Sequence, residues 1–197
     1  YIEAVGWTGD DVWHAHCVQL NSEEINLFAK TGTGIAHCPC SNMRLASGIA
    51  PVKQMLDSGV KVGLGVDGSA SNDSGNMLNE ARQTMLLQRV NSKASSMTAR
   101  EALKVATRGG ASVLNRDDIG VLAPGYDADI TAFKRNNVDF SGSDWDPVAS
   151  LVFCGPGKAN YTIINGKIVV SEGQLTTIPM EKLIHEHNTL SHDLINL

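Results

Sequence analysis

Residues 60–68 of the chain read Val-Lys-Val-Gly-Leu-Gly-Val-Asp-Gly. Apolar side chains recur here at every second position, which is the period of a β-strand. The strand delivers a carboxylate, Asp67, into a loop at 68–75 that is rich in Gly, Ser and Asn. A carboxylate in that place is costly to desolvate unless it is hydrogen-bonded or bound to a cation. We therefore interpret Asp67 as functional, the alternative being an Asp that only orders the loop by accepting hydrogen bonds from the amides of residues 69–71.

Two further apolar runs, at 12–18 and 34–38, precede this stretch and are also predicted to be strands. A helix capped by Asn21 or Ser22 and ended by Gly32 is expected between them. A polar loop at 41–47 and a second helix, with Pro51 in its first turn, should lead to the third strand. The order strand–helix–strand–helix–strand predicts parallel strands with right-handed crossovers.

The predicted secondary structure of the remaining chain changes at about residue 120, from helices to short strands with turns. Before that point the spacing predicts a long helix at 76–90, a helix opened by the capping box of Thr98 and Glu101, and a short helix at 110–114. The inner face of the long helix is expected to carry Leu78, Ala81, Met85 and Leu86. After it we expect strands at 129–133, 161–164 and 167–170, with Asn165-Gly166 as a hairpin turn, and an amphipathic helix at 180–195.

Composition excludes several classes of protein. Of 197 residues, 42% are hydrophobic and 19% charged, and the net charge of −5 comes with no basic tract, which argues against nucleic-acid binding. No apolar run is long enough to cross a membrane, and residues 1–5 have neither the basic start nor the apolar stretch that is typical of a secretory signal. The four cysteines, at 17, 38, 40 and 154, are expected to be reduced in a cytoplasmic protein. A structural zinc site at residues 37–40 is disfavoured because no second Cys pair stands at a suitable spacing.

Three polar residues fall at or near the predicted carboxyl ends of the three parallel strands: His16, His37 and Asp67. In α/β barrels this end carries function, whereas the opposite end serves stability. A lone His is more often a satisfied core residue, but three such residues at successive strand ends favour a shared polar or metal site. The alternative is three unrelated structural residues.

These strand ends resemble a known family. Residues 15–18, 37–42 and 65–72 resemble strands six, seven and eight of the amidohydrolase superfamily, in the branch of triazine hydrolases, guanine-type deaminases and adenosine-derivative deaminases. Residues 120–130 and 165–167 resemble its composite β-sandwich, and residues 40–48 are most similar to 8-oxoguanine deaminases. The resemblance implies the C-terminal part of a (β/α)8 TIM-type barrel at 1–118, a β-sandwich portion at 119–175 and a C-terminal helix at 176–197.

The resemblance also implies roles for individual residues. Asp67 matches the strand-eight metal ligand that accepts the proton of the nucleophilic water, and His16 matches the His that hydrogen-bonds this water or the oxygen of the tetrahedral intermediate. His37 and Ser69 are expected to line the substrate pocket. The cofactor implied is one divalent metal ion, Zn²⁺ or else Fe²⁺, whose other ligands we expect upstream of residue 1. His14-Ala15-His16 is not expected to be the missing His-x-His pair of that metal site, because it stands on the segment that resembles strand six. His185-Glu186-His187 is expected to be a solvated helix face, because residues two apart on a helix point in different directions.

The implied function is hydrolytic deamination of a purine-like heterocycle of the 8-oxoguanine class, with water and that small molecule as partners. One alternative keeps the fold and the metal but releases chloride or an alkylamine from a triazine. Another, from a different class, is a metal-free binding or assembly module. Oligomeric state is left open. We further expect that this segment alone is insoluble or molten, because the strand edge at 12–18 would lie unpaired.

Overall fold

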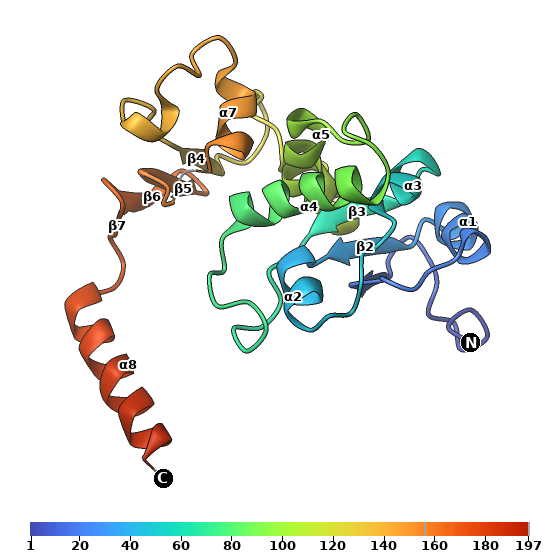
Figure 1. Ribbon diagram of the computed structural model, residues 1–197, viewed down its shortest axis with the longest axis horizontal. Coiled ribbons are helices and arrows are strands. Elements are labelled where there is room, and N and C mark those ends of the chain that lie inside the picture. The colour runs from blue at the N-terminus through green and yellow to red at the C-terminus, as the bar shows by residue number, and fades with distance from the viewer. Residues whose placement is uncertain (156, 197) are drawn as a thin grey trace.

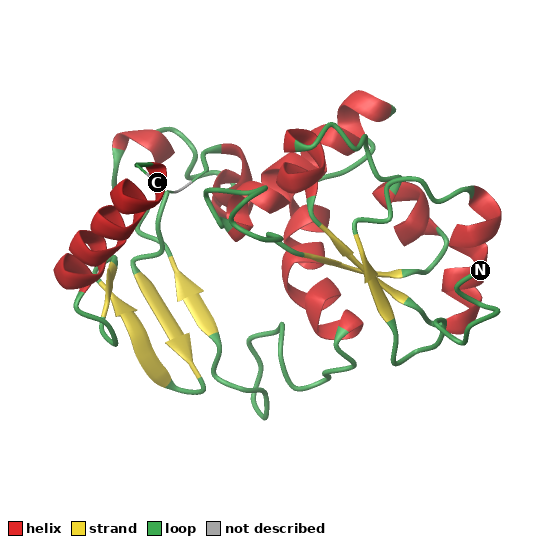
Figure 2. Ribbon diagram, turned by 90° about the horizontal axis from the view of Figure 1, so that it is seen from below, coloured by secondary structure: helices red, strands yellow, loops and turns green. Residues whose placement is uncertain are grey.

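The computed structural model describes residues 1–155 and 157–196 and contains two separate β-sheets, one parallel and one antiparallel (Figure 1). The parallel sheet has three strands in the order β1-β2-β3. The antiparallel sheet has four strands in the order β4-β5-β6-β7. Figure 2 shows the two sheets side by side, with helices between and around them. The predicted α/β class is confirmed.

The parallel sheet consists of β1 (Trp13–Ala15), β2 (Gly34–His37) and β3 (Lys61–Leu64). The register pairs Ala15 with Ala36, and Ala36 with Gly63. The parallel arrangement predicted from the chain order is therefore confirmed. The first and third strands are shorter than the predicted 12–18 and 60–66, because the backbone turns out of the sheet at His16 and beyond Leu64.

Helices pack on the face of this sheet that carries Ile35 and Val62 and bury its apolar side chains. The first, α1 (Ser22–Thr31), begins with the capping box of Asn21 and Glu24 and ends at Gly32 with a φ of 75°. The core is formed by Ile35 and Val62 from the sheet with residues of α1, α3 (Val52–Asp57), α4 (Met77–Asn91) and α5 (Ala99–Lys104). The opposite face is open at β1, where Trp13 is 48% exposed. Strand β1 is also an edge strand, as expected.

Two predictions about this layer were wrong. Residues 41–47 are not simply a polar loop, because α2 (Pro39–Arg44) includes residues 41–44 of that segment. The inner face of α4 does not include Leu86, which is 37% exposed. Polar side chains take its place in the interior, namely Glu80, Thr84 and Gln88. Each of them makes a hydrogen bond there, which offsets the loss of solvation.

The helix that follows Thr98 contains a turn that the sequence pattern did not predict. The capping box of Thr98 and Glu101 opens α5, as expected. The chain then continues as a π-helical turn, η1 (Val105–Gly109), into α6 (Gly110–Val113). A Cβ atom at Gly109 would lie 2.1 Å from the carbonyl oxygen of Val62. Only glycine allows this helix to approach β3 so closely.

The antiparallel sheet comprises β4 (Ile130–Ala132), β5 (Tyr161–Ile164), β6 (Lys167–Ser171) and β7 (Gln174–Leu175). Asn165 and Gly166 have φ values of 48° and 72°, which confirms the predicted hairpin turn. Between β4 and β5 the chain forms a 3-10 turn, η2 (Val138–Phe140), and a short helix, α7 (Pro147–Phe153), neither of which was predicted. Asp146 caps α7 and forms a two-bond ion pair with Arg100 of α5.

The last helix, α8 (Met180–Ile195), confirms the predicted bounds. It extends away from the rest of the molecule in Figure 1, and none of its residues is buried. Its apolar side chains, including Leu190 and Leu194, are exposed. Across the two described ranges, no helix combines the length and the apolar character that crossing a lipid bilayer requires.

Candidate functional site

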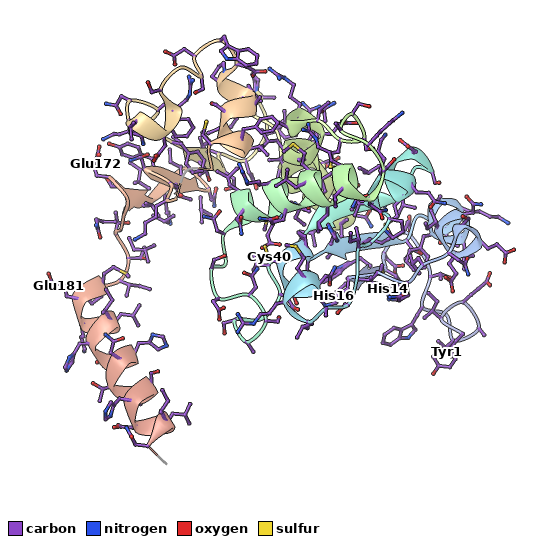
Figure 3. All side chains as sticks on the ribbon, in the orientation of Figure 1. Tyr1, His14, His16, Cys40, Glu172 and Glu181 are labelled. Carbon is purple, nitrogen blue, oxygen red and sulfur yellow. The ribbon has the colours of Figure 1, made fainter. Side chains whose placement is uncertain are left out.

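The carboxyl ends of β1 and β3 bring His16 and Asp67 together, with α2 packed beside them. The distance from His16 Nε2 to Asp67 Oδ2 is 3.6 Å. Figure 3 shows His16 next to α2, the helix that also carries Cys40. Both side chains remain partly open to solvent, with 37% of His16 and 33% of Asp67 exposed. The two residues predicted to be catalytic therefore form one site.

His16 leaves the sheet through a strained turn. Its own N–H still bonds to the carbonyl oxygen of Ala36, at 2.9 Å, as the last bond of the ladder. The N–H of Cys17 then bonds back to Ala15 O at 2.8 Å, which closes a three-residue turn around His16 with a φ of 65°. A γ-turn with positive φ at its centre is the rare, strained form. This turn swings the imidazole out of the alternation of β1 and towards β3.

The imidazole of His16 is oriented by α2. Its Nδ1 lies 2.8 Å from Oδ1 of Asn42, which is buried. With the amide in this orientation, Nδ1–H donates to Asn42, and the neutral ring carries its lone pair on Nε2. Nε2 is the nitrogen that faces Asp67. The ring is thus held with its basic nitrogen in the site.

Two hydroxyl groups converge on one oxygen of Asp67. Ser41 Oγ donates to Oδ2 at 2.6 Å, and Ser71 Oγ lies 3.1 Å from the same atom. The Ser41 hydroxyl, with the backbone N–H of Gly68 and the Ser71 hydroxyl, holds the pKa of the Asp67 carboxyl below its usual value. Asp67 itself has a φ of 62°. The carboxyl is therefore ionised at neutral pH and presented on a strained backbone.

These contacts differ from those of a purely loop-ordering Asp. Such an Asp would accept hydrogen bonds from the amides of residues 69–71, but the N–H of Ser71 bonds to Gly68 O instead. The bonds from the two serine hydroxyls use Oδ2, and no side chain in residues 1–155 or 157–196 donates to Oδ1. One carboxylate oxygen is therefore fixed by hydroxyl groups, while the other faces no side-chain donor.

The other two predicted site residues lie differently. Ser69 is exposed on the loop after Asp67, where Ser71 rather than Ser69 contacts the carboxylate. His37 is fully buried, on the same face of β2 as the core residue Ile35, and neither ring nitrogen has a hydrogen-bond partner among the described residues. Burial, with a smaller effect of His16, lowers the pKa of His37 to about 4. His37 is thus a neutral interior residue near the site and does not reach its open side.

The remaining candidate ligands make other contacts. His14 stacks on Phe28 with ring centroids 5.4 Å apart, and its Nε2 lies 3.0 Å from Trp7 O. Burial raises the pKa of the Cys38 thiol to about 11 and that of Cys40 to about 12, in both cases with a contribution from Glu80. Without a metal ion, both thiols are thus protonated at neutral pH. His14 and the two cysteines are therefore engaged in packing.

The donor types at the site fit part of a metal centre. Carboxylate and imidazole are both ligands of zinc, and Asp67 offers an oxygen without a side-chain donor. A zinc site in a protein takes three or four protein ligands. Within the part of the chain that the structure describes, no cluster of three or more His, Cys, Asp or Glu residues is placed to hold a metal ion. These residues can supply one part of such a centre.

A separate hollow of about 710 Å³ lies between the start of α4, the region of α5 and η1, and the antiparallel sheet. Its lining is mostly apolar and includes Met77, Leu103 and Ile130. Neither His16 nor Asp67 lines it. The hollow therefore does not belong to the site at the strand ends.

Sequence reasoning missed the residues that hold the site in place. Ser41 and Asn42 stand in the segment at 37–42 but were not assigned a role, because their use depends on α2 forming beside β1 and β3. Ser71 was recognised only as part of a polar loop. Glu80, a buried carboxylate that contacts both α2 and the loop after Asp67, carries no local sequence signal.

Comparison with protein families and curated proteins gives the following matches. A model described as "Amidohydrolase family" matches residues 1–169. The chain is 46% identical over 195 residues to the 8-oxoguanine deaminase of Pseudomonas aeruginosa, which covers 99% of this chain and 43% of that protein. It is 36% identical over 205 residues to an isoxanthopterin deaminase from an unknown prokaryotic organism, with 96% of this chain and 42% of that protein covered.

Solved structures show the same architecture. The crystal structure of a mutant of the atrazine chlorohydrolase TrzN from Arthrobacter aurescens, complexed with zinc and atraton, superposes with a TM-score of 0.90. The sequence identity is 37%, over 96% of this chain and 42% of that chain. The chain therefore spans less than half of the length of each of these three relatives.

Proposed function

The chain belongs to the amidohydrolase family, and on that premise we propose that the protein containing it is a metal-dependent deaminase of a purine-like heterocycle, with 8-oxoguanine as the type of substrate. The observation that carries the proposal is the approach of His16 Nε2 to Asp67 Oδ2, at 3.6 Å, at the carboxyl end of the parallel sheet. A base and a carboxylate that face the same small space can together orient a water molecule and take its proton.

The proposed cofactor is one divalent metal ion, Zn²⁺ in preference to Fe²⁺. When bound, it supplies a nucleophile at neutral pH, because it lowers the pKa of water to about 7. Asp67 would hold it through the carboxylate oxygen that receives no side-chain hydrogen bond. The remaining ligands would come from other parts of the protein. The zinc in the TrzN complex supports this choice of metal.

The side chains of this chain account for the proton transfers. His16 Nε2 accepts a hydrogen bond from the attacking water, whose oxygen forms a bond to the ring carbon that bears the amino group. The π bond from this carbon to the adjacent ring nitrogen breaks, and its electron pair stays on that nitrogen until the amino group leaves and the double bond forms again. The proton of the water passes to Asp67 Oδ2, and the hydroxyls of Ser41 and Ser71 can then accept a hydrogen bond where they previously donated one. Asp67 returns the proton to the amino nitrogen, the carbon–nitrogen bond breaks, and ammonia leaves. Asn42 keeps the imidazole aligned throughout.

The substrate class follows from the chemistry that two relatives share. 8-Oxoguanine and isoxanthopterin, named for the relatives, both carry one exocyclic amino group on a pyrimidinone ring fused to a second, oxidised ring. We propose a free base rather than a nucleic acid as the substrate, which agrees with the net charge of −5. The four free cysteines support a reducing, cytoplasmic compartment.

A second candidate changes only the leaving group. The likeness to TrzN, named as a chlorohydrolase, favours displacement of chloride or an alkylamine from a triazine ring. Chloride leaves as an anion and requires no proton, so the return of the proton from Asp67 would be dispensable. The higher identity to the 8-oxoguanine deaminase, 46% against 37%, supports deamination as the first candidate.

The proposal is tested by measuring the metal content of the full-length protein and the product that it releases from each candidate substrate. We expect about one metal ion per chain, as for a mononuclear zinc enzyme, and ammonia release that is faster from 8-oxoguanine than from guanine, isocytosine or an aminotriazine. Asp67→Asn should abolish the release, whereas Asp73→Asn, an exposed Asp in the same loop, should not. Metal with chloride release but no ammonia would favour the triazine hydrolase, and a protein that binds no metal would favour the metal-free binding module.

A further inference from the structure

The helix that follows Asp67 carries a carboxylate in the protein interior. Glu80, in the first turn of α4, is 0% exposed and lies next to the core residue Ala81. A buried carboxylate is strongly destabilising unless each oxygen receives a hydrogen bond. The two oxygens of Glu80 meet this requirement with donors from two different segments, and both segments form part of the candidate site.

The first oxygen of Glu80 holds α2. Oε2 accepts a hydrogen bond from the backbone N–H of Cys40 at 3.1 Å. The residue in the N-cap position of α2, Cys38, makes no side-chain capping bond, and Pro39 has no N–H. Glu80 therefore provides the cap from a different helix. The next two residues of α2 are Ser41 and Asn42, whose side chains bond to Asp67 and His16.

The second oxygen of Glu80 holds the loop that presents Asp67. Oε1 accepts a hydrogen bond from Asn72 Nδ2 at 2.8 Å, and the same amide group donates to Val66 O at 2.8 Å. Val66 is joined directly to Asp67, whose backbone is left-handed. The carbonyl of the preceding peptide is thus fixed in direction by a side chain that Glu80 orients.

We propose that Glu80 is a positioning residue for the pair His16 and Asp67, acting through Cys40 and Asn72. The inference rests on the proposed function, because that function gives His16 and Asp67 their catalytic roles. The hydrogen bonds of Glu80 that hold the two residues do not depend on which substrate is bound. Glu80 touches neither His16 nor Asp67. One oxygen of its carboxylate holds α2, which aligns the imidazole of His16. The other oxygen holds the 66–72 segment, which orients the carboxyl group of Asp67. Loss of Glu80 should loosen both members of the pair together.

The chain provides a matched control on the same helix. Gln88, two turns further along α4, is also buried and also joins two segments, here through two backbone groups. Its Oε1 accepts from the N–H of Lys53 and its Nε2 donates to Ala50 O, both at 3.0 Å. Lys53 lies in the first turn of α3 and Ala50 lies just before that helix. In the described part of the chain, no side-chain hydrogen bond joins either residue to His16 or Asp67. Gln88 therefore has the structural role of Glu80 without the connection to the site.

The experiment compares Glu80→Met with Gln88→Met in the full-length, metal-containing protein. Both variants should lower Tm by a similar amount, because each removes two buried hydrogen bonds. Only Glu80→Met should lower kcat, on the order of 100-fold at nearly constant KM, since a misplacement of about 1 Å is enough for that loss. Glu80→Gln, which keeps one acceptor, should fall between it and the wild type and serves if the Met variant does not fold. Equal effects of Glu80→Met and Gln88→Met on kcat would overturn the proposal.

A second readout separates this inference from the proposed function. Amide hydrogen exchange of the same proteins should become faster at residues 38–45 and 66–73 in Glu80→Met, and at residues 49–57 in Gln88→Met. If the wild type releases ammonia from no heterocycle, the proposed function fails, while this exchange pattern still supports the positioning role. Unchanged exchange at 38–45 and 66–73 in Glu80→Met would overturn it whatever the activity.

Discussion

The hairpin of the antiparallel sheet and the strand ends of the parallel sheet both contain residues in the left-handed backbone conformation, and they do so for different reasons. In the hairpin between β5 and β6, Asn165 and Gly166 adopt φ values of 48° and 72°. At the ends of β1 and β3, His16 and Asp67 adopt φ values of 65° and 62°. Asn-Gly prefers this conformation by itself, because a type I′ turn requires positive φ at both positions.

At His16 and Asp67 the conformation is imposed by contacts from elsewhere in the fold. Asn42 holds the imidazole, Ser41 holds the carboxylate, and Asn72 fixes the peptide before Asp67. A left-handed residue with a Cβ atom costs about 1–2 kcal/mol. The hairpin conformation therefore follows from local preference, whereas the strand-end conformation is maintained by tertiary hydrogen bonds, as is common at functional sites.

The largest effect is expected from Asp67→Gly. Glycine adopts the same φ without strain, so the relief of strain should offset the lost hydroxyl contacts and leave the free energy of unfolding within about 1 kcal/mol of the wild type. Ammonia release should fall by at least about 10³-fold, because the proton acceptor is gone. Urea unfolding and steady-state kinetics on the full-length protein measure the two quantities. A large loss of stability would contradict the interpretation that the strained Asp67 serves activity and is not needed to stabilise the fold.

A smaller loss of activity is expected from His16→Asn. Asn tolerates positive φ, so the turn at the end of β1 should persist. The imidazole Nε2 that faces Asp67 is lost, and kcat should fall by about 10²-fold, the magnitude typical of removing one group that stabilises the transition state. Tm should change little. Activity within threefold of the wild type would remove His16 from the site and leave its strained turn without a functional explanation.

The same comparison explains which parts of the fold could be predicted from the sequence. The parallel strands, the caps of Asn21 and Thr98 and the Asn165-Gly166 turn depend on residues close in the chain, and all were predicted. Helix α2 and the π-helical turn η1 were missed. The first is capped by Glu80, 40 residues away, and the second exists because Gly109 lies against the carbonyl of Val62.

In the candidate site, too, the sequence predicted the features that depend on nearby residues and missed those that depend on tertiary contacts. His16 and Asp67 were selected because both stand at strand ends, and the structure places them together. His37 was selected by the same criterion but has its side chain on the buried face of β2. Position at a strand end does not predict the direction in which the side chain points. At His16 this direction depends on a γ-turn that the sequence pattern does not predict. Their catalytic roles stay predictions.

His37 supplies a test of intermediate size that concerns stability and pH. Burial lowers its pKa to about 4 from the ordinary value of 6.5, so the unfolded chain binds a proton between these pH values and the folded chain does not. The stability must therefore decrease as the pH falls through this window. His37→Leu, of similar volume, should remove this loss, which amounts to about 2–3 kcal/mol between pH 7 and pH 4.5.

Urea unfolding of the wild type and His37→Leu at the two pH values isolates this contribution, because the other titrating groups are common to both proteins. At pH 7 the variant should be as stable as the wild type or more so, since both ring nitrogens lack partners in the described part of the chain. Equal pH dependence in the two proteins would show that His37 gains a hydrogen-bond partner or a proton in the complete protein.

The smallest effect is expected in the hairpin, from Gly166→Ala. No atom lies within 4 Å of a Cβ placed at Gly166, so the substitution meets open space and its effect comes from the backbone alone. At a φ of 72° we expect a loss of about 1 kcal/mol, measured by urea unfolding, with kcat within twofold of the wild type. Asn165→Gly, which relaxes the neighbouring position, should be nearly neutral and is the matched control. A loss of kcat well beyond twofold in Gly166→Ala would show that the antiparallel sheet is coupled to the strand ends. The hairpin conformation would then affect the candidate site and could not be explained by the local preference of its own residues alone.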